Sequence, residues 1–164
     1  MDPRTASVPN PDRRNRAGPA LLLVAGLFLL AMVATWSLLG PQRAAVSLDG
    51  EPRQVQDDAF YDYAARVPDA PRPVELAVGA VAASGALGLA ILALGSRAGV
   101  ASTTGARLVG TGASLLAGAI VGYGGRIVTA GVVGANIGAG LVLFFGVPLT
   151  VALLVVATLV AARR

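Results

Sequence analysis

The chain has 164 residues, of which 55% are hydrophobic and 13% are charged, and its formal net charge is +4. It contains no His, Cys or Lys, which excludes thiolate and imidazole catalysis, Schiff bases, disulfides and the usual zinc and haem ligands. We therefore expect no enzyme activity, no cofactor and no bound metal. The composition is typical of a membrane protein that crosses the bilayer several times.

The N-terminal segment 1–19 is polar and brings four prolines and four arginines up to the first apolar run. These features predict a disordered, basic cytoplasmic tail. Residues 20–39 follow without a single charge, which is long enough for a membrane-spanning helix. No A-x-A-like cleavage site lies near the end of this run, so we expect an uncleaved first span and not a signal peptide.

Residues 40–73 form a polar, proline-rich segment that we expect to be an extracytoplasmic loop. Within it, 55–67 places apolar and charged residues on opposite faces of a short amphipathic helix, suited to lie on the membrane surface. Three aspartates here could begin a divalent-cation site, but a solvated helix face is favoured because no EF-hand spacing supports the site. The aromatic residues of this helix that could contact a partner are Phe60, Tyr61 and Tyr63.

Two further spans are predicted at 74–94, opened by Pro73, and at 106–125, joined by a short cytoplasmic turn at 95–105. Small residues recur every fourth position in the third span and beyond it. In lipid such small residues let two helix backbones approach closely, so they predict packing faces, and we expect the small-residue face of the second span to meet them. The predicted packing residues are Gly110, Ser114, Gly118, Gly122, Ala130, Gly134 and Gly138.

The remaining apolar stretch is too long for one span, because residues 127–161 would extend about 52 Å as a straight helix. We therefore predict a glycine-rich external connection at 126–140 and a fourth span at 141–162, kinked by Pro148. An alternative register moves the third helix to about 112–134 and buries Arg126 in the membrane. In either register Glu75 is the acid closest to a span, so an ion pair of Arg126 with Glu75 is expected.

The arginines indicate the orientation of the spans. With both termini in the cytoplasm, eight of the 13 arginines lie in cytoplasmic segments or, for Arg107, at the cytoplasmic end of a span. The positive-inside rule favours this orientation. The net positive charge is then a topology signal, and because no basic helix accompanies it we expect no nucleic-acid binding.

The predicted fold is an all-α bundle of four transmembrane helices with both termini cytoplasmic and a short amphipathic helix in the first external loop. Abundant packing surface without reactive residues favours a non-catalytic structural or accessory subunit of a complex in the bacterial plasma membrane. Its expected partners are the lipid bilayer and either other membrane subunits or further copies of itself. The alternative is a small homo-oligomeric channel or permease whose pore is lined by 126–140, with Asn136 and Arg126 as its polar groups.

Overall fold

The computed structural model describes residues 12–40, 46–48, 51–53, 70–95, 103–130 and 135–162. Within these residues, four helical stretches are long and apolar enough to span a membrane: Gly18–Leu39, Arg72–Gly95, Thr104–Val128 and Ile137–Ala162. The prediction of a helical bundle with four helices able to span a membrane is confirmed for this part of the chain. The helices are α1 (Asp12–Leu39), α2 (Arg72–Gly95), α3 (Thr104–Val128), α4 (Ala135–Leu141) and α5 (Val147–Ala162), and a π-helical segment η2 (Val142–Gly146) joins α4 to α5.

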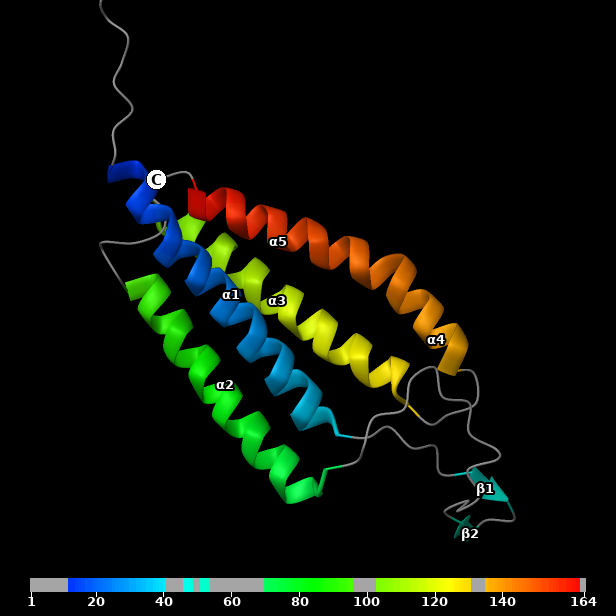
Figure 1. Cartoon of the computed structure of the whole chain (residues 1–164). Helices are drawn as coiled ribbons and strands as arrows, with labels where there is room; N and C mark the ends of the chain where they lie inside the picture. Colours follow the sequence, from blue (N-terminus) through cyan, green and yellow to red (C-terminus); the bar gives the residue numbers. More distant parts are fainter. Residues whose placement is uncertain are drawn as a thin grey trace, which may run out of the picture.

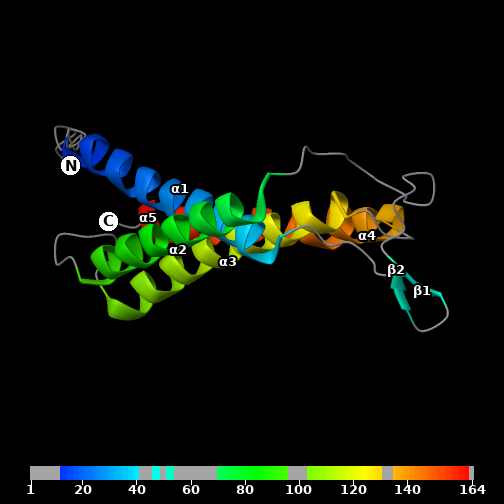
Figure 2. The ribbon, with the colours of Figure 1, turned by 90° about the horizontal axis from the view of Figure 1, so that it is seen from below.

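Helices α1 and α3 pack against each other along the middle of the bundle, with α2 on the far side of α1 and α5 on the far side of α3 (Figure 1). The beginning of α1, the end of α2, the beginning of α3 and the end of α5 lie at one end (Figures 1 and 2). A small cluster with Ala20 of α1, Ala113 of α3 and Ala161 of α5 packs near this end. With four spans, the chain thus enters and leaves the bundle at the same end.

The predicted glycine ladder of α3 is the contact surface between α3 and its neighbours, and all four of its residues are buried. A Cβ atom placed on Gly118 would overlap the Phe28 carbonyl oxygen of α1, and one on Gly122 would lie 2.5 Å from the Met32 carbonyl oxygen. A Cβ on Gly110 would instead lie 3.1 Å from Val160 of α5. The ladder therefore packs on α1 and α5, and our expectation that it meets the second span was wrong.

Helix α2 packs mainly on α1 through a stripe of small residues. A Cβ on Gly79 would lie 2.9 Å from Leu38 of α1, and one on Gly85 would lie 3.3 Å from Leu30. Small residues alone do not determine which helix packs on them, because any helix with a matching surface can approach them. The buried residues of this stripe are Gly79, Ala82, Ala86, Ala90 and Ala93.

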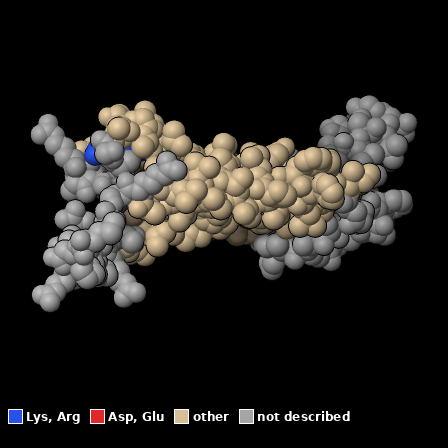
Figure 3. Space-filling model, turned by 90° about the horizontal axis from the view of Figure 1, so that it is seen from above, with Lys and Arg blue, Asp and Glu red and all other residues tan. Residues whose placement is uncertain are grey.

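The outer surface of the bundle carries many large apolar side chains, as expected for contact with lipid. On α3, Val109, Leu116 and Tyr123 are each more than half exposed, on the face opposite the ladder. Figure 3 shows one long side of the bundle, where the described surface is uncharged between the two ends. A soluble helical bundle has the opposite arrangement, with its large apolar side chains inside and polar side chains outside.

Two predicted boundaries were wrong. Helix α1 begins at Asp12, so residues 12–19 are helical although we expected a disordered tail; once a span is formed, adding residues to its end is easier than nucleating a helix. Helix α3 continues to Val128 and α4 begins at Ala135, so the connection predicted at 126–140 is much shorter. Of the glycines in this segment, Gly138 packs closely in α4: a Cβ there would lie 2.7 Å from Ile127.

Segment η2 ends two residues before Pro148 and shows how the fourth span accommodates the proline at the predicted kink. A proline has no N–H and its ring collides with the carbonyl group four residues earlier. The wider π turn relieves this collision, and the Val147 N–H donates to the Val142 carbonyl five residues back. The fourth span consequently extends through Pro148 to Ala162.

The predicted external loop contains two short strands, β1 (Val46–Leu48) and β2 (Glu51–Arg53), which pair in antiparallel register. We did not predict them, although Asp49-Gly50 between the strands is a typical dipeptide of two-residue hairpin turns. The amphipathic helix expected at 55–67 lies outside the described residues.

Candidate functional site

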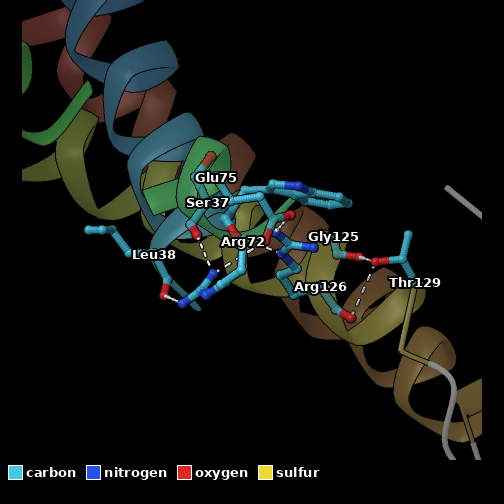
Figure 4. Close-up of polar contacts among 8 residues, drawn as sticks. Ser37, Leu38, Arg72, Glu75, Gly125, Arg126 and Thr129 are labelled. Carbon is cyan, nitrogen blue, oxygen red and sulfur yellow. Dashed lines mark hydrogen bonds and ion pairs between the residues drawn. The ribbon is translucent and has the colours of Figure 1, made fainter. Parts of the chain in front are cut away.

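Three charged side chains gather at the end of the bundle where α1 ends, α2 begins and α3 ends (Figure 4). Arg72 is the first residue of α2, Glu75 lies in the first turn of α2, and Arg126 lies in the last turn of α3. Together with Trp36 of α1 they form what we call the polar cluster. It contains the ion pair expected from the sequence and two residues, Trp36 and Arg72, that sequence reasoning missed.

Arg126 is buried between helices near the end of its span, with its side chain only 7% exposed. Its Nη2 donates to Glu75 Oε1 at 2.6 Å, and its Nε donates to the Trp36 carbonyl oxygen at 2.5 Å. The guanidinium carbon lies 4.6 Å from the centre of the Trp36 ring, close enough for a cation–π interaction. Arg126 therefore lies in the last turn of α3 and not in the middle of a helix at 112–134, and neighbouring helices bury its charge.

Arg72 binds the same carboxylate from the other side. Its Nη1 donates to Ser37 carbonyl oxygen at 2.9 Å and to Glu75 Oε2 at 3.2 Å, and its Nη2 donates to the Leu38 carbonyl oxygen at 2.7 Å. The last four carbonyl groups of a helix have no partner within that helix and carry its negative dipole end. In α1 three of these carbonyls receive arginine N–H groups, so the polar cluster caps α1 and joins the ends of three helices.

Two glycines make room for the cluster. A Cβ on Gly125 of α3 would overlap the Trp36 indole ring, so glycine lets the ring lie against α3 and over Arg126. Gly40 follows α1 with a φ of 69°, the left-handed conformation usual for a residue that ends a helix. A Cβ at Gly40 would also overlap the Arg72 guanidinium group. The signal in the sequence was Gly40-Pro41 directly after an apolar run.

The opposite end of the bundle uses an arginine in a similar way. Arg107, near the start of α3, donates from Nη1 to the carbonyl oxygen of Leu94 at 3.5 Å, close to the end of α2. The start of α3 is itself capped by Thr103, whose hydroxyl oxygen accepts from the Ala106 N–H at 3.3 Å. Arginine side chains thus supply donors to helix C-termini at both ends of the bundle.

Comparisons with protein-family models, curated proteins and solved structures found no match.

The other residues predicted for a site are spread along the bundle. Gly110, Ser114, Gly118 and Gly122 are buried packing residues of α3, and the Ser114 hydroxyl donates to the Gly110 carbonyl at 2.8 Å. Ala130 is buried at the end of the described α3 segment. Asn136 lies in α4, but its side chain is outside the described part of the chain, as are Gly134, Phe60, Tyr61 and Tyr63.

The polar cluster is suited to hold helices together. Both oxygens of Glu75 accept from arginine, the Arg126 guanidinium binds a carboxylate and a carbonyl group, and the Glu75 and Arg126 side chains are almost fully covered. Among the described residues there is also no group of three His, Cys, Asp or Glu side chains that could hold a metal ion.

Replacing Gly40 by Ala should reveal how closely Arg72 fits the end of α1. In this variant the alanine must adopt the left-handed conformation, which costs about 1–2 kcal/mol. Its Cβ must also displace the guanidinium from its carbonyl partners. We expect a lower unfolding temperature in dodecyl maltoside than for the wild type. In an Arg72→Ala background the second cost disappears, so the same Gly40→Ala change should lower the temperature less. Equal effects in both backgrounds would contradict the fit.

Proposed function

We propose that this chain is a non-catalytic structural or accessory subunit of a membrane protein complex in the bacterial plasma membrane. The main support for this proposal is the set of contacts in the polar cluster. Its carboxylate and guanidinium groups bind one another and the carbonyl groups at the end of α1. An ion pair between two helices supports a structural role because it fixes how the helices are placed against each other, and Arg126 and Glu75 are both engaged within the bundle.

The outer face of α2 supports a role in assembly. Ala80, Ser84 and Gly88 follow one another at intervals of four residues and are all exposed. A Cβ on Gly88 would have no heavy atom within 4 Å. Buried ladders of the same pattern hold α3 to its neighbours within the chain, and an exposed one permits another helix to approach closely. This face is accordingly where a partner subunit is proposed to bind.

The test is purification of the tagged protein from its native membrane in a mild detergent, with the mass of the intact particle and the identity of its components determined. Recovery with a different protein in fixed stoichiometry is the expected result. Gly88→Leu should lose that protein while keeping the wild-type unfolding temperature. Gly112→Leu is the matched control, because Gly112 is also exposed with open space around its Cβ position but lies on α3.

Recovery of a homo-oligomer alone would contradict the accessory role and favour the channel or permease. Flux through the purified protein in liposomes would then be measured, with Asn136→Leu as the variant expected to alter it. That alternative also assigns Arg126 to the pore, whereas Arg126 is engaged with Glu75 and Trp36 of the same chain.

We further propose that both termini are cytoplasmic and that the polar cluster lies at the extracytoplasmic end. The chain has no cysteine, so a single introduced cysteine reports its own location. A membrane-impermeant maleimide should label Ser47→Cys in intact spheroplasts, whereas it should label Ser102→Cys only after lysis. Labelling with the opposite pattern would show that the bundle is inverted.

A further inference from the structure

We propose that Arg72 binds the phosphate group of a membrane phospholipid at the end of the bundle where α1 ends. The proposal concerns a binding site on this chain and is independent of the accessory role. It rests on the charge of the polar cluster, the unused donors of Arg72, the rigidity of its guanidinium group and its level relative to the lipid-facing surface.

The charges of the polar cluster do not cancel. It holds two arginines and one glutamate, so its formal charge is +1. Arg126 and Glu75 are almost fully covered, with side chains 7% and 11% exposed, whereas the Arg72 side chain is 43% exposed. The negative end of the α1 dipole offsets only about half of a charge. The excess positive charge is therefore presented outward by Arg72.

Arg72 also has hydrogen-bond donors to spare. A guanidinium group has five N–H donors. Three of them point to the Ser37 carbonyl, the Leu38 carbonyl and Glu75. The Nε–H and one Nη2–H have no partner within the described part of the chain. Two neighbouring N–H groups of a guanidinium bind phosphate oxygens in a fork, with charge-assisted hydrogen bonds.

The guanidinium group is held in place before any ligand arrives. Arginine normally loses much side-chain freedom when it binds, and this loss weakens affinity. Here the hydrogen bonds to α1 and to Glu75 have already fixed the side chain, at a position where glycine at residue 40 makes room for it. A phosphate group bound to Arg72 would therefore cost less ordering than one bound to a free surface arginine.

The position of Arg72 matches the level of lipid headgroups. It is the first residue of a span, and Val74 and Val78, which follow it in the first two turns of α2, are 52% and 45% exposed on the apolar exterior. A cation at the boundary between an apolar helix surface and water lies where the phosphates of a bilayer are found. Lipid is thus the source of phosphate that is always present at this level, at high local concentration.

The decisive experiment is solid-state NMR of the full chain, labelled with 15N-arginine, in phospholipid liposomes and phosphate-free buffer. We expect dipolar dephasing of the Arg72 Nε signal by lipid 31P. The Arg126 Nε signal is the internal control, because that nitrogen donates to Trp36 inside the bundle and should not be dephased. A dephased Arg126 with an undephased Arg72, or no dephasing of either, would overturn the proposal.

A second sample separates lipid from free phosphate. It holds the same protein in dodecyl maltoside micelles with inorganic phosphate and without phospholipid. No dephasing of Arg72 is expected there, and dephasing in this sample alone would overturn the lipid assignment and identify free phosphate as the ligand. Arg72→Lys assigns the signal by removing it. If that variant does not fold, 13C-carbonyl serine labelling assigns the wild-type signal, because Arg72 Nη1 lies 2.9 Å from the Ser37 carbonyl oxygen.

Discussion

Leucine in place of Gly118 is expected to prevent α1 and α3 from packing. Gly118 is buried at their contact, and a Cβ there would overlap the Phe28 carbonyl oxygen and lie 2.8 Å from the Ala31 Cβ and 3.0 Å from the Met32 nitrogen. These are mostly backbone atoms, which can move only if the helices separate. We expect a loss of about 3 kcal/mol or more in unfolding free energy, measured by denaturation in detergent micelles, and even Gly118→Ala should be destabilising.

Two controls on α3 distinguish helix packing from a general effect of the substitution. Gly112→Leu makes the same chemical change six residues earlier in the chain, at an exposed position with no heavy atom within 4 Å of its Cβ. Leu116→Ala removes a side chain that is 52% exposed. Both variants should remain within about 1 kcal/mol of the wild type. Equal losses for Gly118→Leu and Gly112→Leu would refute the close contact of α1 with α3.

Breaking the ion pair of the polar cluster should have the second large effect. Glu75→Leu leaves the buried Arg126 guanidinium without its anion, and Arg126→Leu leaves Glu75 with only the half-exposed Arg72 and the Trp36 carbonyl without its donor. Removing one partner of a buried pair costs about 3–5 kcal/mol because the other charge remains buried. We expect each single variant to unfold at a clearly lower temperature than the wild type in the same detergent.

The double variant completes the measurement. In Glu75→Leu with Arg126→Leu no uncompensated charge is left between α2 and α3, so its loss should be smaller than the sum of the single losses by about 1–3 kcal/mol. Strictly additive losses would mean that the two side chains stabilise the bundle independently. Since helix-end capping by Arg72 survives in the Arg126→Leu single variant, that variant should still fold.

The number of spans and the direction in which side chains face follow from the sequence, because both depend on properties of single helices. A run of about 20 apolar residues spans a bilayer whatever its neighbours are. The four-residue spacing of Gly110, Ser114, Gly118 and Gly122 puts them on one side of a helix, opposite Leu116 and Tyr123. The structure buries the former and exposes the latter.

The sequence was misleading about glycine near the end of α3. We predicted that the third span ends at Gly125 and that a glycine-rich connection begins at Arg126, whereas α3 continues to Val128. Gly124 and Gly125 pack closely inside the bundle, where Val142 of η2 and Trp36 of α1 fill the space that their side chains would occupy. Thr129 ends the helix instead, with its hydroxyl donating to the Gly125 carbonyl at 2.9 Å. Helix propensity alone does not show that a neighbouring helix will fill the space left by a missing side chain.

The pairing of Arg126 with Glu75 could be predicted from the sequence alone, because a charge near a span needs an opposite charge and only one acid was close enough. Only the tertiary structure could decide the rest of the polar cluster and the partner of the glycine ladder. The contacts of Arg72 and Trp36 use backbone carbonyl groups at the end of α1. Every helix ends in such carbonyl groups, so no sequence pattern indicates which of them will bind an arginine. Which helix offers these groups, and which backbone meets Gly118, depends on how the four spans are placed side by side.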